Sequence, residues 1–182
     1  DPREAFENPY EYESQEQFVR ETKQLLDKLV KGLDKYSMTF HQDDRSAQKA
    51  VWLLQFDALE SLRDALGVLE RKRHRVAGKL FRDIIESLDL AAYFHSENDE
   101  SKRRLEKWYS DEIILNSTYR NYVAKTDGIT AAKAKADKYA HLSRFTHRSY
   151  GALMYGYNLG QGDLIWHDSA YESGIGISVH TI

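Results

Sequence analysis

The residues of this chain best suited to chemistry lie close together in HLSRFTHRSYG, residues 141–151. The stretch contains two histidines, two arginines, a tyrosine, two serines and a threonine. On a helix, Ser143 and His147 would share one face, where a local hydrogen bond can join them. A serine beside a histidine is the beginning of a nucleophilic site, which also needs an orienting third group and donors for an oxyanion. The sequence reveals neither, so a serine hydrolase is not favoured.

The histidines of the same stretch do not predict a metal site. His141 and His147 fall on different faces of a helix, and the HExxH pattern is absent. A catalytic metal would need distant ligands such as His95, His167 or Asp168. We therefore expect no metal and no cofactor.

A second polar constellation lies in LFRDIIESLDLAAYF, residues 80–94, where Arg82 and Glu86 are spaced to pair on a helix. An ordinary explanation is a solvated helix face whose ion pair contributes little to stability. The functional hypothesis is that this face meets the Ser143 and His147 face inside a helical bundle. Such an interface would offer a guanidinium for a phosphate and a histidine that transfers protons near neutral pH.

These residues belong to segments whose apolar side chains recur at three- and four-residue spacing, which is typical of helices. We expect helices over about 14–36, 76–94, 105–109 and 130–150. Another helix should begin after a cap at Asp43, Asp44 or Ser46 and end near residue 69. A further short helix should end at Gly128. The inward phase of the two most apolar helices predicts a buried core of Leu54, Phe56, Leu62, Leu66, Leu80, Ile84 and Leu88.

The predicted fold class is all-α, an antiparallel bundle of about five to six helices with an irregular C-terminal extension. We assign residues 1–13 to an N-terminal extension, 14–150 to the helical bundle domain and 151–182 to an irregular tail. Glycine becomes frequent only in this tail, where the helical period is lost. Within it, LIWHD and IGISVHTI are candidates for short strands, and a short hairpin is one interpretation.

Composition excludes several function classes. The absence of cysteine rules out disulfides, thiolate zinc sites and a cysteine nucleophile. No apolar run approaches the roughly 20 residues of a membrane-spanning helix, so we expect a cytoplasmic protein with no membrane partner. The net charge of −3 provides no overall attraction for nucleic acid. The basic run ERKRHR, residues 70–75, has two interpretations: a nucleic-acid or targeting patch, or, as we favour, the cations that suit a helix C-terminus.

One resemblance to a known family covers roughly residues 70–150. The segment GKLFRDIIESLDLAAYFHSENDESKRRLEKWY, followed by YAHLSRFTHRS, resembles bacterial all-helical domains close to the HEPN superfamily. That superfamily includes defence-associated ribonucleases and abortive-infection proteins such as AbiV. The resemblance implies a component of a phage-defence or toxin–antitoxin system that acts on RNA. It also points to Arg82, Glu86, Ser143 and His147 as the catalytic residues of a metal-independent ribonuclease.

The chain departs from the catalytic pattern of that family. The pattern has an arginine, a polar residue and a histidine four to six residues beyond the arginine-led start. Here Arg144 precedes Phe145, and His147 follows after only three residues, while Arg120–Asn121 has no histidine in range. A non-catalytic interaction or scaffold module is therefore the alternative, and a small-molecule-binding bundle is the second. The partners to consider are a second copy of the chain in a homodimer, RNA, or another protein.

Overall fold

The computed structural model describes residues 15–36, 39–71, 73–147, 150, 157–159 and 165–167. The helices are α2 (Gln15–Asp34), α3 (Ala47–Glu70), α4 (His74–His95), α5 (Asp99–Tyr109) and α6 (Asn116–Thr146). Strands β1 (Tyr157–Leu159) and β2 (Ile165–His167) form an antiparallel pair in which Asn158 is opposite Trp166. The predicted all-α class is confirmed for the bundle, and β2 lies within the segment LIWHD. The predicted strand in IGISVHTI lies outside the described residues.

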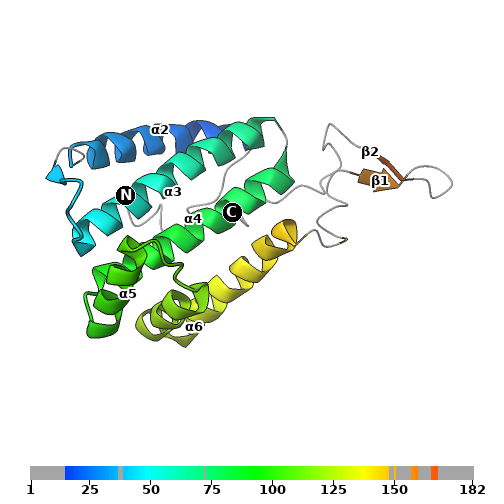
Figure 1. Ribbon diagram of the computed structural model, residues 1–182. Coiled ribbons are helices and arrows are strands. Elements are labelled where there is room, and N and C mark those ends of the chain that lie inside the picture. The colour runs from blue at the N-terminus through cyan, green and yellow to red at the C-terminus, as the bar shows by residue number, and fades with distance from the viewer. Residues whose placement is uncertain are drawn as a thin grey trace.

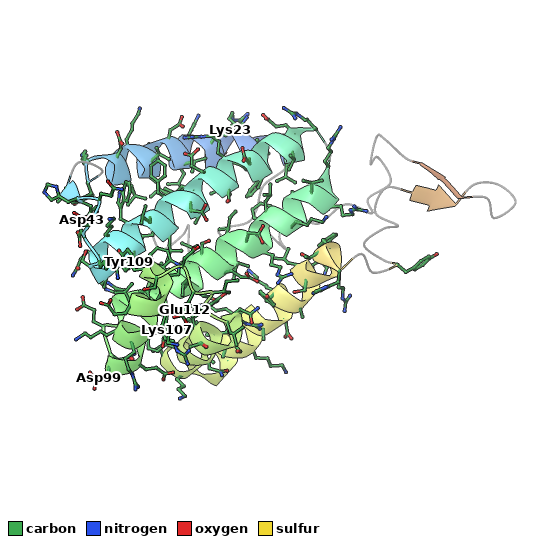
Figure 2. The ribbon with its side chains drawn as sticks, in the orientation of Figure 1. Lys23, Asp43, Asp99, Lys107, Tyr109 and Glu112 are labelled. Atoms are coloured by element: carbon green, nitrogen blue, oxygen red, sulfur yellow. The ribbon has the colours of Figure 1, made fainter. Side chains whose placement is uncertain are left out.

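The long helices pack in a row, with α2 against α3, α3 against α4, and α4 against α6 (Figure 1). The short helix α5 lies near one end of the long helices and contacts both α3 and α4. Tyr109, in the last turn of α5 (Figure 2), links α5 to the beginning of α3, because its hydroxyl donates to the carbonyl of Ser46 at 2.9 Å. The row leaves α4 central, so side chains of α4 meet both α3 and α6.

Local polar side chains set where the helices begin. Ser46 is the N-cap of α3, and its hydroxyl accepts from the Lys49 N–H at 3.2 Å, while Asp44 accepts from the Ser46 N–H at 2.7 Å. Asn98 caps α5 in the same way and accepts from the Ser101 N–H at 2.9 Å. These contacts satisfy backbone donors that a helix cannot satisfy internally. Of the three predicted caps, Ser46 is the one used.

Gly128 divides α6 into two segments. Its φ of 84° and ψ of 165° are not helical, and they lie in a region that only glycine adopts without strain. The predicted end of a helix at Gly128 agrees with this break. The first segment therefore changes direction before the second begins, and the two segments enclose a cleft beside α4. The predicted first residue of the first helix, residue 14, lies outside the described residues.

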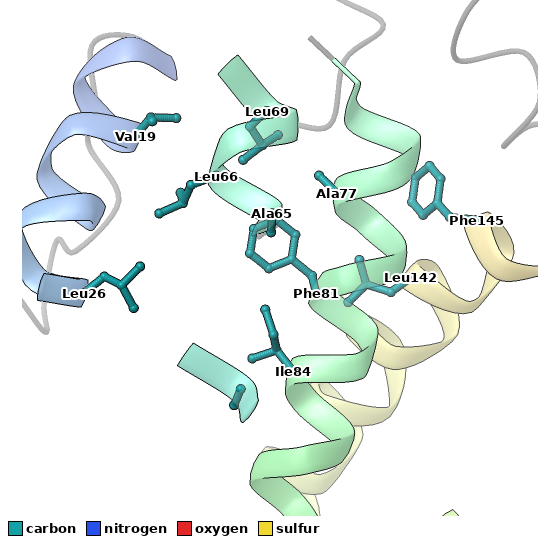
Figure 3. Packing of buried hydrophobic residues seen from close by; sticks show 11 residues of the cluster. Val19, Leu26, Ala65, Leu66, Leu69, Ala77, Phe81, Ile84, Leu142 and Phe145 are labelled. Atoms are coloured by element: carbon teal, nitrogen blue, oxygen red, sulfur yellow. The ribbon is translucent and has the colours of Figure 1, made fainter. Parts of the chain in front are cut away.

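The core consists of two hydrophobic clusters. The first joins α2, α3, α4 and α6 (Figure 3) and contains Val19, Leu26, Ala58, Ala65, Leu66, Leu69, Ala77, Phe81, Ile84, Leu142 and Phe145. The second joins α3, α4, α5 and α6 and contains Ala50, Tyr93, Phe94, Leu105, Ile114 and Tyr119. Residues of α4 occur in both clusters, which agrees with its central position.

The predicted core is correct in part. Leu66 and Ile84 are buried, whereas Leu54, Phe56, Leu62 and Leu80 are half-buried. The prediction for Leu88 is wrong, because 46% of this residue is exposed. Leu88 lines a shallow groove of ≈ 330 Å³ between α3 and α4, together with Val51 and Ala92. The small side chain of Ala92 leaves this groove open, and the described residues cover only part of Leu88 there.

The close approach of α4 and α6 depends on Gly78. A Cβ atom at this position would lie 2.7 Å from Cδ2 of Phe145, a ring that is 1% exposed and cannot easily move. We expect Gly78→Ala to lower the free energy of unfolding by about 1–2 kcal/mol, since overpacking outweighs the gain in helix propensity. Urea unfolding followed by circular dichroism measures this change.

The matched control is Gly67→Ala in α3, where a Cβ would meet nothing within 4 Å. This substitution should raise the free energy of unfolding by about 0.5–1 kcal/mol, because alanine restricts the unfolded chain more than glycine does. Equal effects at the two positions would contradict the packing described for Phe145.

Candidate functional site

Arg82 and Glu86, one turn apart on α4, form the ion pair that their spacing predicts. Arg82 Nε and Nη2 each lie 3.0 Å from Oε1 of Glu86. The two side chains are only 16% and 28% exposed, which distinguishes them from the ordinary surface pairs of this chain. A partly buried pair needs further hydrogen bonds to satisfy its remaining donors and acceptors.

Tyr139 on α6 supplies these hydrogen bonds. Its hydroxyl accepts from Arg82 Nη2 at 2.8 Å and from Asn116 Nδ2 at 2.8 Å, and it donates to Glu86 Oε1 at 2.5 Å. A phenolic hydroxyl donates once and accepts at most twice, so its capacity is fully used. The network of Arg82, Glu86, Tyr139 and Asn116 thereby joins α4 to both segments of α6. We call this network a clamp, because its hydrogen bonds hold α4 against both segments of α6.

Burial and hydrogen bonds together shift the pKa values of Tyr139 and Arg82. Burial raises the pKa of the Tyr139 phenol, and the hydrogen bond to Glu86 and the charge of Glu86 raise it further. Burial alone would lower the pKa of Arg82, but the hydrogen bonds to Tyr139 and Glu86 outweigh it and the pKa is raised. The phenol therefore stays protonated and the guanidinium stays charged at neutral pH. Neither group is prepared to exchange a proton with a substrate.

The other two predicted site residues, Ser143 and His147, do not join this network. His147 is exposed at the end of α6, where its backbone N–H donates to the Ser143 carbonyl at 3.0 Å. No hydrogen bond links Ser143 or His147 to the Arg82–Glu86 pair in the described part of the chain, and the role proposed for them in catalysis stays a prediction.

The register of α4 against α6 explains this outcome. Phe145 packs at the level of Gly78, and the two helices run in opposite directions. With a rise of about 1.5 Å per residue, Tyr139 lies about 9 Å along α6 from Phe145, which is level with the turn between Arg82 and Glu86. His147 lies beyond Phe145 in the other direction. Tyr139 is therefore closer to the level of the turn between Arg82 and Glu86 than Ser143 or His147 is.

A cleft of ≈ 480 Å³ lies beside the network, between α4 and the two segments of α6. Asn116 and Arg120 belong both to this cleft and to the surroundings of Tyr139, because Arg120 Cζ lies 4.0 Å from the centre of the Tyr139 ring. The lining residues are Asp89, Asn116, Ser117, Arg120, Asn121, Val123, Ala124, Ala132, Lys133, Lys135 and Ala136. The cleft is thus formed by cations, amides and small side chains.

The cations that line the cleft differ in whether a described carboxylate forms an ion pair with them. Lys135 lies 2.7 Å from Asp127 and 3.7 Å from Asp89, so it is already paired. Burial raises the pKa of Asp89, while the charges of Lys135 and Arg120 act in the opposite direction. In the described part of the chain, no ion pair engages Arg120 or Lys133. These two cations are available to an anion that enters the cleft.

The sequence interpretation missed Tyr139 and Lys133, because the tract TAAKAKADKYA was explained by helix propensity alone. One feature could have identified Tyr139. It precedes Ser143 by four residues and therefore lies on the helix face that was expected to meet Arg82. Lys133 has no comparable pattern, because its relation to Arg120 depends on the change of direction at Gly128.

The described residues contain neither a candidate metal site nor a candidate membrane-spanning helix. No group of three or more His, Asp or Glu side chains in this part of the chain is arranged to hold a metal ion. None of the described helices combines the length and the apolar character that crossing a membrane requires.

Comparisons with known proteins identify no relative. No model of a known protein family matches the chain, and no curated protein and no solved structure matches it. Any function must therefore be argued from the network and the cleft.

Proposed function

We propose that this chain is a HEPN-like helical domain that binds single-stranded RNA in the cleft between α4 and the two segments of α6. The observation that carries the proposal is the Arg120 guanidinium, which forms no ion pair within 4.0 Å among the described residues and is held over the Tyr139 ring at 4.0 Å. A guanidinium fixed in this way loses little freedom when it binds a phosphate. The bacterial defence role implied by the sequence resemblance is part of this proposal.

The other cleft residues suit a phosphate backbone. Lys133 provides a second cation without an ion pair in the described part of the chain, and Asn116, Ser117 and Asn121 provide amide and hydroxyl donors. Contacts of these types account for most protein hydrogen bonds to nucleic-acid phosphates. Because the net charge of the chain is −3, binding would depend on this local group of cations and not on an overall field.

Arg120→Gln combined with Lys133→Gln should weaken binding of a fluorescein-labelled RNA octamer by at least about tenfold. The dependence of log affinity on log salt should become shallower by about 0.7 for each cation removed, because fewer counterions are released. Fluorescence anisotropy over a salt series measures both quantities. Lys133→Gln alone, at an exposed position, should give the smaller of these effects without disturbing the fold.

The control is Lys28→Gln combined with Lys31→Gln on α2, which removes the same charge from exposed positions on a helix that packs against α3. If the two double variants weaken RNA binding equally, the cleft is not the binding site. Gel analysis of the same samples in EDTA tests for cleavage. We expect intact RNA, because the Tyr139 hydroxyl donates its proton to Glu86 and Arg82 donates to Glu86 and Tyr139. Cleavage that His147→Ala abolishes would instead support the ribonuclease.

A further inference from the structure

A second hollow, of ≈ 390 Å³, adjoins the cleft. Ser117 and Asn121, one turn apart on α6, line both spaces and form the boundary between them. The far side of this hollow includes Tyr93, Asn98 and Glu100, and the near side includes Tyr122 and Lys125. A molecule bound in the cleft can therefore extend over short polar side chains into the hollow.

The hydroxyl of Tyr93 is the unusual group in this hollow. Tyr93 is 3% exposed, and in the described part of the chain its oxygen is the single buried side-chain polar atom without a hydrogen-bond partner. A buried hydroxyl without a partner destabilises a protein, and a group of this kind calls for an explanation. Burial raises the pKa of Tyr93, and the charge of Glu100 raises it further, so the phenol is protonated at neutral pH. It can both donate and accept.

The lining of the two spaces differs in charge. The cleft has three cations, Arg120, Lys133 and Lys135, against one carboxylate, Asp89. The hollow has one cation, Lys125, and one carboxylate, Glu100, with amide and phenol groups around them. A phosphate is favoured in the cleft, whereas the hollow suits an uncharged group rich in hydrogen-bond donors and acceptors.

The aromatic side chains narrow the class of that group. The rings of Tyr93 and Tyr122 are in edge contact, with centroids 5.5 Å apart, and both line the hollow. Proteins that bind unpaired RNA combine aromatic contacts with hydrogen bonds to base edges and to the ribose hydroxyl. A nucleoside unit combines the flat surface and the polar edges that this lining complements.

We propose that the hollow is a nucleoside subsite, in which the Tyr93 hydroxyl forms a hydrogen bond with the base of a nucleotide whose phosphate lies in the adjacent cleft. This inference rests on the proposed RNA binding and specifies its ligand chemistry. Asn121, on the boundary, would contact the same nucleotide between its phosphate and its base.

The test compares wild-type protein with Tyr93→Phe, which removes the hydroxyl and keeps the ring. The probes are a mixed-sequence RNA octamer and an abasic ribose-phosphate octamer with the same number of phosphates. Tyr93→Phe should weaken binding of the RNA about three- to tenfold, the loss of one hydrogen bond, and should leave binding of the abasic probe unchanged. Its melting temperature should equal or exceed that of the wild type, because the hydroxyl forms no hydrogen bond with any of the described residues.

Tyr36→Phe, at a residue that is 58% exposed on the chain following α2, is the matched control and should change neither affinity. Equal binding of the two probes by the wild type, or no effect of Tyr93→Phe on the RNA, overturns the nucleoside subsite and leaves the phosphate cleft standing. Failure of the wild type to bind either probe overturns the RNA-binding proposal itself. A lowered melting temperature of Tyr93→Phe would show that the hydroxyl has a structural partner, which also contradicts the subsite.

Discussion

Replacing Leu66 with alanine is expected to lower the free energy of unfolding by about 2–5 kcal/mol, the range for truncating a leucine inside a packed core. Leu66 has no exposed surface and lies in the cluster that joins α2, α3, α4 and α6 (Figure 3). Truncation would leave a cavity inside this cluster, whose members come from four helices. Urea unfolding followed by circular dichroism gives the change directly.

Two further leucine-to-alanine variants calibrate this result, because the same atoms are removed from sites of different burial. Leu62 is half-buried against the same cluster, so Leu62→Ala should lower the free energy of unfolding by less than Leu66→Ala. Leu88 is 46% exposed, so Leu88→Ala should lower the free energy of unfolding by about 1 kcal/mol or less. A loss at Leu88 as large as the loss at Leu66 would mean that the groove between α3 and α4 is closed in solution.

Tyr139→Phe is expected to lower the free energy of unfolding by about 1–3 kcal/mol, the cost of leaving buried polar groups without a partner. The phenylalanine ring keeps the packing of a side chain that is 9% exposed, so the change isolates the hydroxyl. Without it, Arg82 and Asn116 each lose an acceptor, and Glu86 loses a donor. Arg82 and Glu86 keep each other, which limits the loss.

The matched control is Tyr150→Phe, at a residue that is 75% exposed, where we expect almost no change. The two variants are compared by urea unfolding at pH 7. A loss below about 0.5 kcal/mol for Tyr139→Phe would indicate that water replaces the hydroxyl in the network, contrary to the clamp proposed here. Such a result would leave Arg82 and Glu86 accessible to ligands from solvent.

The sequence by itself determined the features that depend on neighbours along the chain. The spacing of apolar residues predicted the helices, and the glycine in TDG predicted the break at Gly128. The four-residue spacing of Arg82 and Glu86 predicted their ion pair. These features follow from helical periodicity and from backbone conformation, which act over only a few residues. The error at Leu88 arose because periodicity defines a helix face but not whether a neighbour covers it.

Only the tertiary structure decided what Arg82 meets on α6. Ser143, His147 and Tyr139 share one helix face, and periodicity alone cannot choose among them. The choice was made by the packing of Phe145 over Gly78, which fixes how far α6 is shifted along α4. The cleft has the same origin, because Arg120 and Lys133 line one space only after the chain changes direction at Gly128 and both segments pack beside α4. Contacts between helices depend on close packing over the whole interface, and no short stretch of sequence contains that information.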